Sequence, residues 1–199
     1  MRARPRYQTE PIQLRDIIWR QGFITPLQMM RIAAWKSARG LASLTLNDEA
    51  AIEIHTRQLL RSIEPWRNAD VLHDAVDWAA WERTAATAIG SKRGRTGLLA
   101  LDGFGYPMAS AFLAVLAPTV FPVIDRWAVN GLYGSSIGNY QRAHVYTDFA
   151  RGLVAHAKHF AEERTMHELD IAMMSAAMKC RHVERPCECL PFLAAAFPA

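Results

Sequence analysis

Apolar residues recur at helical spacing along almost the whole chain, and the alternating pattern of a half-buried strand is scarce. Pro26 suits the first turn of one helix, and Gly40 suits its end. Asn47 or Asp48 suits the N-cap of the next helix, and a third helix is expected to close at Gly90. The sequence therefore predicts an all-α protein of about eight to ten helices.

The composition is that of a globular chain. Of its 199 residues, 51% are hydrophobic and 21% are charged, which favours one compact domain or two small lobes sharing a core. No apolar run approaches the roughly 18 residues of a membrane span, and the first residues, MRARPRYQTEP, lack the apolar core of a secretory signal. We expect a soluble cytoplasmic protein, and the net charge of +4 is compatible with a polyanionic partner.

A glycine-bracketed turn interrupts the helical pattern in its middle. Residues 96–101 and 107–117 are expected to form two short helices joined by Gly103, Phe104 and Gly105. Both glycines can adopt positive φ, which lets the chain reverse within a few residues. Phe104 is expected to pack inward and hold the two helices together.

The amides that follow this turn open the second helix and are suited to an anion such as phosphate. Pro107 fits the first helical turn, where its missing N–H costs nothing. Lys92, Arg93 and Arg95 in the preceding connector add cations beside the turn. An αα-corner that needs glycines only to turn is the plain structural alternative.

An acidic residue, Asp125, follows the apolar segment Pro122-Val123-Ile124 and precedes Trp127. Carrying a carboxylate on an apolar approach is costly unless the group is paired or used. Asp125 is expected to cap the next helix, which would keep it ionised.

Together these two pieces resemble the helix-hairpin-helix DNA glycosylase superfamily, the endonuclease-III-like fold. Its signature is a Leu-x-Gly-apolar-Gly hairpin followed by a catalytic aspartate in a Pro-apolar-apolar-Asp segment. Leu101, Gly103, Phe104 and Gly105 match the hairpin, and residues 122–125 match the aspartate segment at the family's spacing.

The resemblance implies a two-lobed helical glycosylase fold over residues 1–199 as a single unit. Residues 26–122 would form one lobe, with the helix-hairpin-helix at 96–117. Residues 1–25 and 123–199 would form the second lobe, leaving a cleft between the two.

The resemblance also implies a DNA glycosylase that flips a damaged or modified base from double-stranded DNA and hydrolyses its glycosidic bond. Asp125 would be catalytic, the hairpin with Tyr106 would bind the DNA backbone, and Tyr106 and Trp127 would line the base pocket or serve as core aromatics. The protein would act as a monomer at the nucleoid. Oxidised, alkylated or hypermodified phage bases all remain candidates, so both repair and phage defence stay open as roles, and a catalytically idle DNA-binding module is the alternative.

Family members that also cut the strand carry a lysine two residues after the second hairpin glycine. Pro107 occupies that position here and offers no amine. The chain therefore resembles the monofunctional members, and the abasic site would be left uncut. Lys92 or Lys158 would have to replace the missing amine in a lyase.

The chain has three cysteines, Cys180, Cys187 and Cys189, too few for the four ligands of an iron–sulfur cluster. His182 is spaced irregularly for a zinc site, and His156 and His159 on one helical side fit an exposed helix better than a metal site. We expect neither metal nor cofactor.

Overall fold

The computed structural model describes residues 10–37, 41–133, 142–160 and 164–180, and all regular structure in this part of the chain is helical. No strand forms there beyond an isolated bridge between Ser91 and Thr96. The prediction of an all-α protein is therefore confirmed. The α-helices are α1 (Glu10–Gln21), α2 (Pro26–Lys36), α3 (Leu41–Leu44), α4 (Glu49–Ile63), α5 (Trp78–Ile89), α6 (Tyr106–Leu116), α7 (Arg126–Tyr133), α8 (Ala143–Phe160) and α9 (Met166–Cys180), with 3-10 turns η2 (Glu64–Trp66) and η3 (Leu98–Ala100).

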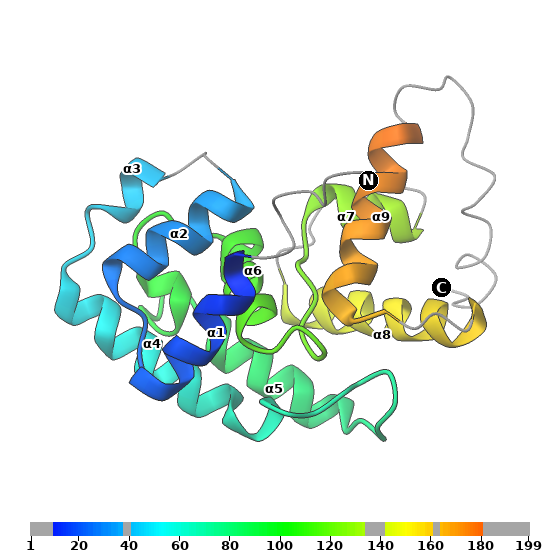
Figure 1. The fold of residues 1–199 in the computed structure, drawn as a ribbon, viewed down its shortest axis with the longest axis horizontal. Helices are drawn as coiled ribbons and strands as arrows, with labels where there is room; N and C mark the ends of the chain where they lie inside the picture. Colours follow the sequence, from blue (N-terminus) through cyan, green and yellow to red (C-terminus); the bar gives the residue numbers. More distant parts are fainter. Residues whose placement is uncertain (1–9, 38–40, 134–141, 161–163, 181–199) are drawn as a thin grey trace.

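The helices form two neighbouring groups (Figure 1). Helices α1 to α6 make up the first group, α7 to α9 make up the second, and α5 runs beneath the first group to reach α8. Helix α1 packs on α6 and α2. This described part of residues 1–25 therefore lies with the first group, and not with the residues after 123 as the predicted lobe boundaries had it.

Helix α6 forms the centre of the first group because it is apolar on every side. All of its residues except Pro107 are buried. At its end, Arg15 Nε and Trp19 Nε1 of α1 both donate to the Leu116 carbonyl at 3.1 Å. These two bonds satisfy a terminal carbonyl that has no partner within the helix.

Helix α2 begins with a capping box in which Thr25 and Gln28 satisfy each other's backbone N–H groups. Pro26 occupies the first turn, as the sequence predicts. The helix ends at Lys36, short of the predicted stop at Gly40, because Ser37 is extended. Consequently Lys36 is the last residue of the helix.

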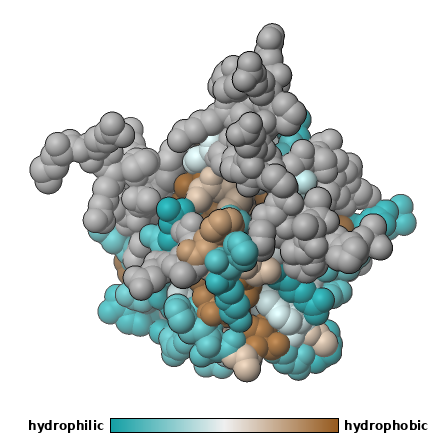
Figure 2. Space-filling view, turned by 90° about the vertical axis from the view of Figure 1, so that its right-hand side faces the viewer, coloured by the Kyte–Doolittle hydropathy of each residue, from teal (hydrophilic) through white to brown (hydrophobic). Residues whose placement is uncertain are grey.

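Helix α9 also begins as its sequence suggests. Thr165 and Glu168 form a capping box, with Thr165 N–H donating to Glu168 Oε2 at 2.9 Å and Glu168 N–H donating to Thr165 Oγ1 at 3.2 Å. Figure 2 views the molecule from the α7–α9 side, and hydrophobic residues form a band down the middle of that face, with hydrophilic residues on both sides of its lower part. None of the described helices is both long and apolar enough to cross a membrane.

Candidate functional site

The glycine-bracketed turn forms, but its first helix is shorter than predicted. In place of a helix over 96–101 there is a single 3-10 turn, η3, because Gly97 precedes it at positive φ and Leu101 after it is extended. Gly103 adopts a φ of +81°, as predicted. A Cβ at Gly103 would lie 2.9 Å from Leu44 Cδ2. The turn can therefore approach α3 this closely only because glycine has no side chain.

Gly105 differs from the prediction of positive φ. Its φ is −126° and its ψ is 174°, which is extended backbone that any residue adopts. The residue is the N-cap of α6, and an added Cβ would lie 3.8 Å from Pro107 Cδ. The backbone conformation at the second glycine of the hairpin, Gly105, is therefore one that any residue can adopt.

Two contacts hold the turn against the first group. Phe104 is 1% exposed and packs on Phe112, with ring centroids 5.0 Å apart, which confirms that it points inward. Asn47 accepts a hydrogen bond from Asp102 N–H at 2.7 Å and donates to the Asp102 carbonyl at 3.0 Å. Asp48, and not Asn47, is the N-cap of α4.

The basic connector is a tight loop closed by the Ser91–Thr96 bridge. Lys92, Arg93 and Arg95 are all exposed on it. Their cationic groups are accessible to a polyanion, and the loop leads directly into η3 and the turn.

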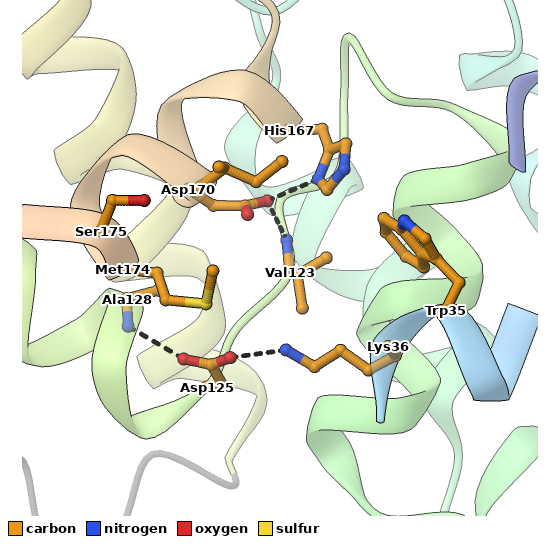
Figure 3. Close-up of a pocket in the computed structure, with 10 residues that line it drawn as sticks. Trp35, Lys36, Val123, Asp125, Ala128, His167, Asp170, Met174 and Ser175 are labelled. Atoms are coloured by element: carbon orange, nitrogen blue, oxygen red, sulfur yellow. Dashed lines mark hydrogen bonds and ion pairs between the residues drawn. The ribbon is translucent and has the colours of Figure 1, made fainter. Parts of the chain in front are cut away.

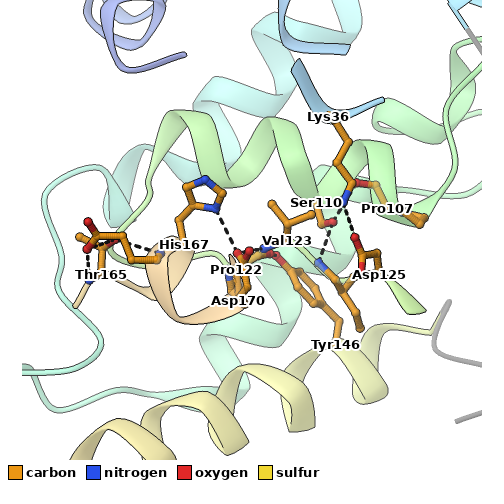
Figure 4. Close-up of polar contacts among 12 residues, drawn as sticks. Lys36, Pro107, Ser110, Pro122, Val123, Asp125, Tyr146, Thr165, His167 and Asp170 are labelled. Carbon is orange, nitrogen blue, oxygen red and sulfur yellow. Dashed lines mark hydrogen bonds and ion pairs between the residues drawn. The ribbon is translucent and has the colours of Figure 1, made fainter. Parts of the chain in front are cut away.

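Residues 118–120 form a turn, and the extended segment 121–125 follows it and carries Asp125. Backbone groups along both parts bond to side chains or backbone of distant elements (Figure 4). Buried backbone groups require such partners. The pairs are His167 N–H to the Pro118 carbonyl at 3.1 Å, Trp81 Nε1–H to the Val120 carbonyl at 3.3 Å, Tyr146 O–H to the Pro122 carbonyl at 2.7 Å, Val123 N–H to Asp170 Oδ2 at 2.6 Å, and Ile124 N–H to Ser110 Oγ at 3.1 Å. This segment therefore places Asp125 rigidly.

Asp125 caps α7, as predicted. Its Oδ1 accepts hydrogen bonds from the N–H groups of Trp127 and Ala128, both at 2.9 Å. The cap occupies one carboxylate oxygen and leaves Oδ2 to face away from the helix.

The other oxygen of Asp125 contacts a lysine that no sequence motif marks. Lys36 Nζ lies 2.5 Å from Asp125 Oδ2, and the two side chains are 16% and 15% exposed. The lysine comes from the end of α2, 89 residues earlier in the chain. The pair thus joins the first group of helices to the start of α7.

A pocket of about 270 Å³ opens beside this ion pair (Figure 3). In Figure 3, Trp35 and Met174 stand on opposite sides of it, with Lys36 and Asp125 at one end and Asp170 at the other. The lining residues come from α2, the extended segment, α7 and α9, and they are Trp35, Lys36, Val123, Asp125, Ala128, His167, Asp170, Ile171, Met174 and Ser175. Asp125 is therefore accessible from a pocket and not sealed beneath side chains.

A second carboxylate, Asp170, lies in the pocket wall. Its Oδ2 accepts from Val123 N–H and lies 3.1 Å from His167 Nδ1. Burial raises the pKa of the Asp170 carboxyl, and this effect outweighs His167, Val123 and Lys36, which all lower it. The His167 ring also meets the Trp35 ring edge-on at 5.2 Å.

The two aromatics predicted for the base pocket do not line this one. Tyr106 is 9% exposed and belongs to the hydrophobic core. The Trp127 ring is covered by the Arg126 guanidinium, 4.8 Å from the ring centroid. The aromatic wall of the pocket is instead Trp35.

Among the described residues, no group of three or more His, Cys, Asp or Glu side chains is arranged to hold a metal ion. Cys187, Cys189 and His182 lie outside the described residues, and Cys180 ends α9. The prediction about the cysteines therefore stays a prediction.

Sequence reasoning missed most of the pocket. In the sequence, Trp35 and Lys36 have only the features of an ordinary helix end. The tertiary fold brings them to Asp125. Asp170 had one available signal, because it directly precedes the apolar run of residues 171–174 in α9, where a carboxylate is costly unless paired.

Comparison of the chain with family models, with curated proteins and with solved structures found no match.

Proposed function

We propose that the protein is a DNA glycosylase that hydrolyses the bond between a damaged or modified base and its deoxyribose. One observation carries the proposal: Asp125, at the matching position of the glycosylase-like motif, caps α7 with one oxygen, pairs with Lys36 through the other and lines a pocket. Drug-sized ligands occupy pockets of roughly 300–1,000 Å³. A pocket of about 270 Å³ is in keeping with a single flipped base.

The chemistry required of Asp125 is modest. A base in duplex DNA must leave the stack before its glycosidic bond can be reached. Departure of the base leaves positive charge on the sugar, as in glycoside hydrolysis. A fixed carboxylate stabilises that charge and orients or deprotonates the attacking water. The first product is an abasic site.

The walls of the pocket supply the binding surface for the base. Trp35 offers an aromatic face for stacking, and Met174 closes the opposite side. Asp170 Oδ1 makes no hydrogen bond among the described residues and remains available as an acceptor for a donor on the base. Such an arrangement favours bases that carry an N–H group on the edge turned toward Asp170.

In this proposal, the two groups of helices correspond to the two lobes of the glycosylase fold, with DNA bound across the pocket between α2 and the α7–α9 group. The exposed turn at Gly103 and the exposed Lys92, Arg93 and Arg95 contact phosphates. These contacts fix the register of the protein on DNA without reading its sequence. The alternative, a DNA-binding module without catalysis, gives no reason for Asp125 to be accessible from a pocket.

The test is incubation with duplexes that each carry one modified base, followed by alkali to convert abasic sites into nicks. Asp125→Asn should lower base release by about a hundredfold or more, because it removes the charge that stabilises the sugar cation. Asp48→Asn is the matched control, since Asp48 is an exposed N-cap on α4. Equal base release by wild type and Asp125→Asn would reduce Asp125 to a helix cap.

A further inference from the structure

Lys36 differs from the other lysines whose side chains the structure describes. Lys92 and Lys158 are exposed. Lys36 lies in the pocket wall, 16% exposed, with its amine against Asp125. We propose that Lys36 is the nucleophile of a second activity, in which its amine condenses with the aldehyde of an abasic site and the DNA strand is cut by β-elimination. The inference builds on the proposed function, because that aldehyde is its product.

The surroundings of Lys36 suit an amine nucleophile. A lysine reacts as the free amine, so its ammonium proton needs an acceptor within hydrogen-bond distance. Asp125 Oδ2 is at 2.5 Å, and the α7 amides hold the other oxygen in place. Lys36 makes no hydrogen bond to any other described side chain that would fix its amine elsewhere.

The pocket also brings the amine to the right part of the substrate. If Asp125 faces the sugar carbon that loses its base, then Lys36, in contact with Asp125, faces the same carbon. Trp35, Val123 and Met174 make much of the remaining wall apolar, which limits the water that would hydrolyse an imine.

The steps balance without any co-reactant beyond water. Asp125 takes the ammonium proton, and the Lys36 amine adds to the C1′ aldehyde carbon. Asp125 returns the proton to the hydroxyl group that leaves as water, which produces a protonated C1′=N imine. Removal of a C2′ proton by the carboxylate then forms the C2′=C3′ double bond while the C3′–O bond breaks. The downstream strand leaves with its 5′ phosphate, and water hydrolyses the imine to restore Lys36.

This proposal departs from the expectation that the abasic site is left uncut. That expectation rested on Pro107, which does exclude an amine at the hairpin position. Helix α2 supplies an amine from a different part of the chain. No sequence motif around Lys36 predicts this role.

The experiment uses the full chain and a duplex that already contains one abasic site, so no knowledge of the excised base is needed. Borohydride reduces an imine to a stable amine and thereby links protein to DNA. Wild type should give a crosslinked band, and peptide mapping should place the crosslink on Lys36. Lys36→Arg should lose the band at least about a hundredfold while keeping a cation beside Asp125. Lys158→Arg, at an exposed lysine on α8, should keep the band.

Each result supports or overturns the proposal, and the glycosylase and lyase activities are tested independently of each other. No crosslink with wild type, or a crosslink mapped to another amine such as the amino terminus, overturns the role of Lys36. Base release from a modified duplex without any crosslink retains the glycosylase and removes the lyase. Crosslinking at Lys36 without base release from any modified duplex retains the lyase and removes the glycosylase. Because the wild-type crosslink and its mapping are decisive, a variant that fails to fold does not spoil the test.

Discussion

Ser110 Oγ accepts a hydrogen bond from the backbone N–H of Ile124 at 3.1 Å, in a buried position. The same hydroxyl donates to the Pro107 carbonyl at 3.2 Å, within the first turn of α6. A single side chain therefore ties the start of the helix that follows the hairpin to the residue before Asp125.

Ser110→Ala should destabilise the protein by about 1–3 kcal/mol, because it leaves the buried Ile124 N–H without a partner. Urea unfolding measures the change. Ser62→Ala is the control, since the Ser62 hydroxyl bonds only to the Gln58 carbonyl on the exposed side of α4, and it should change stability by less than about 0.5 kcal/mol. Equal effects at the two sites would contradict the structural role of Ser110.

The two hairpin glycines should respond differently to the same substitution. Gly103→Ser should cost about 1–3 kcal/mol, since its φ is +81° and its Cβ would crowd Leu44. Gly105→Ser should be neutral or stabilising, because the backbone is extended and serine is a favourable N-cap for α6. Thermal or urea unfolding of both variants checks this, and a larger loss at Gly105 would contradict the observed turn.

Asp170→Asn should alter the pH dependence of stability. Burial raises the pKa of Asp170 in the folded state, so the native protein binds this proton more tightly than the unfolded chain. The free energy of unfolding of the wild type should therefore fall, relative to Asp170→Asn, as pH rises from about 4 through the folded pKa.

Urea unfolding of the two proteins between about pH 4 and 7 measures that difference. The carboxamide oxygen in the Asp170→Asn variant would still accept the Val123 N–H, so the bond that holds the extended segment is preserved. Asp16→Asn on α1 is the control, because Asp16 is exposed. A difference that stays constant over this range would show that Asp170 titrates alike in both states.

DNA binding should weaken with salt and depend little on sequence. Lys92→Ala and Arg93→Ala should each reduce the slope of log affinity against log salt by about one, if each cation contacts one phosphate. Lys92→Arg and Arg93→Lys retain the charges and should keep the slope. Titration of a fluorescent duplex at several salt concentrations measures it, and an unchanged slope in the alanine variants would place the contacts elsewhere.

Features set by local chemistry were predictable from the sequence. The capping role of Asp125, the capping box of Thr165 and Glu168, and the inward-pointing Phe104 depend on residues a few positions away. The all-helical class follows from the period of apolar residues. Such signals lie within one turn or two of the chain, so tertiary packing did not override them.

Features that depend on distant contacts were not predictable. Lys36 and Asp125 are 89 residues apart, and only the docking of α2 beside α7 and α9 brings them together. Gly103 and Gly105 look equivalent in the sequence, and the contact of Gly103 with Leu44 of α3 distinguishes them. Asn47 resembles a helix cap but instead holds the backbone of Asp102.

The capping box at Thr25 fixes where α2 starts, and Lys36 is its last residue, so the number of residues between them sets where the amine lies. An α-helix turns by about 100° and advances by about 1.5 Å with each residue. Inserting one alanine in the middle of α2 would therefore leave every pocket residue present in the sequence while rotating the Lys36 amine away from Asp125. The chemistry of the site is thus encoded in the length of this helix as much as in the identity of its residues.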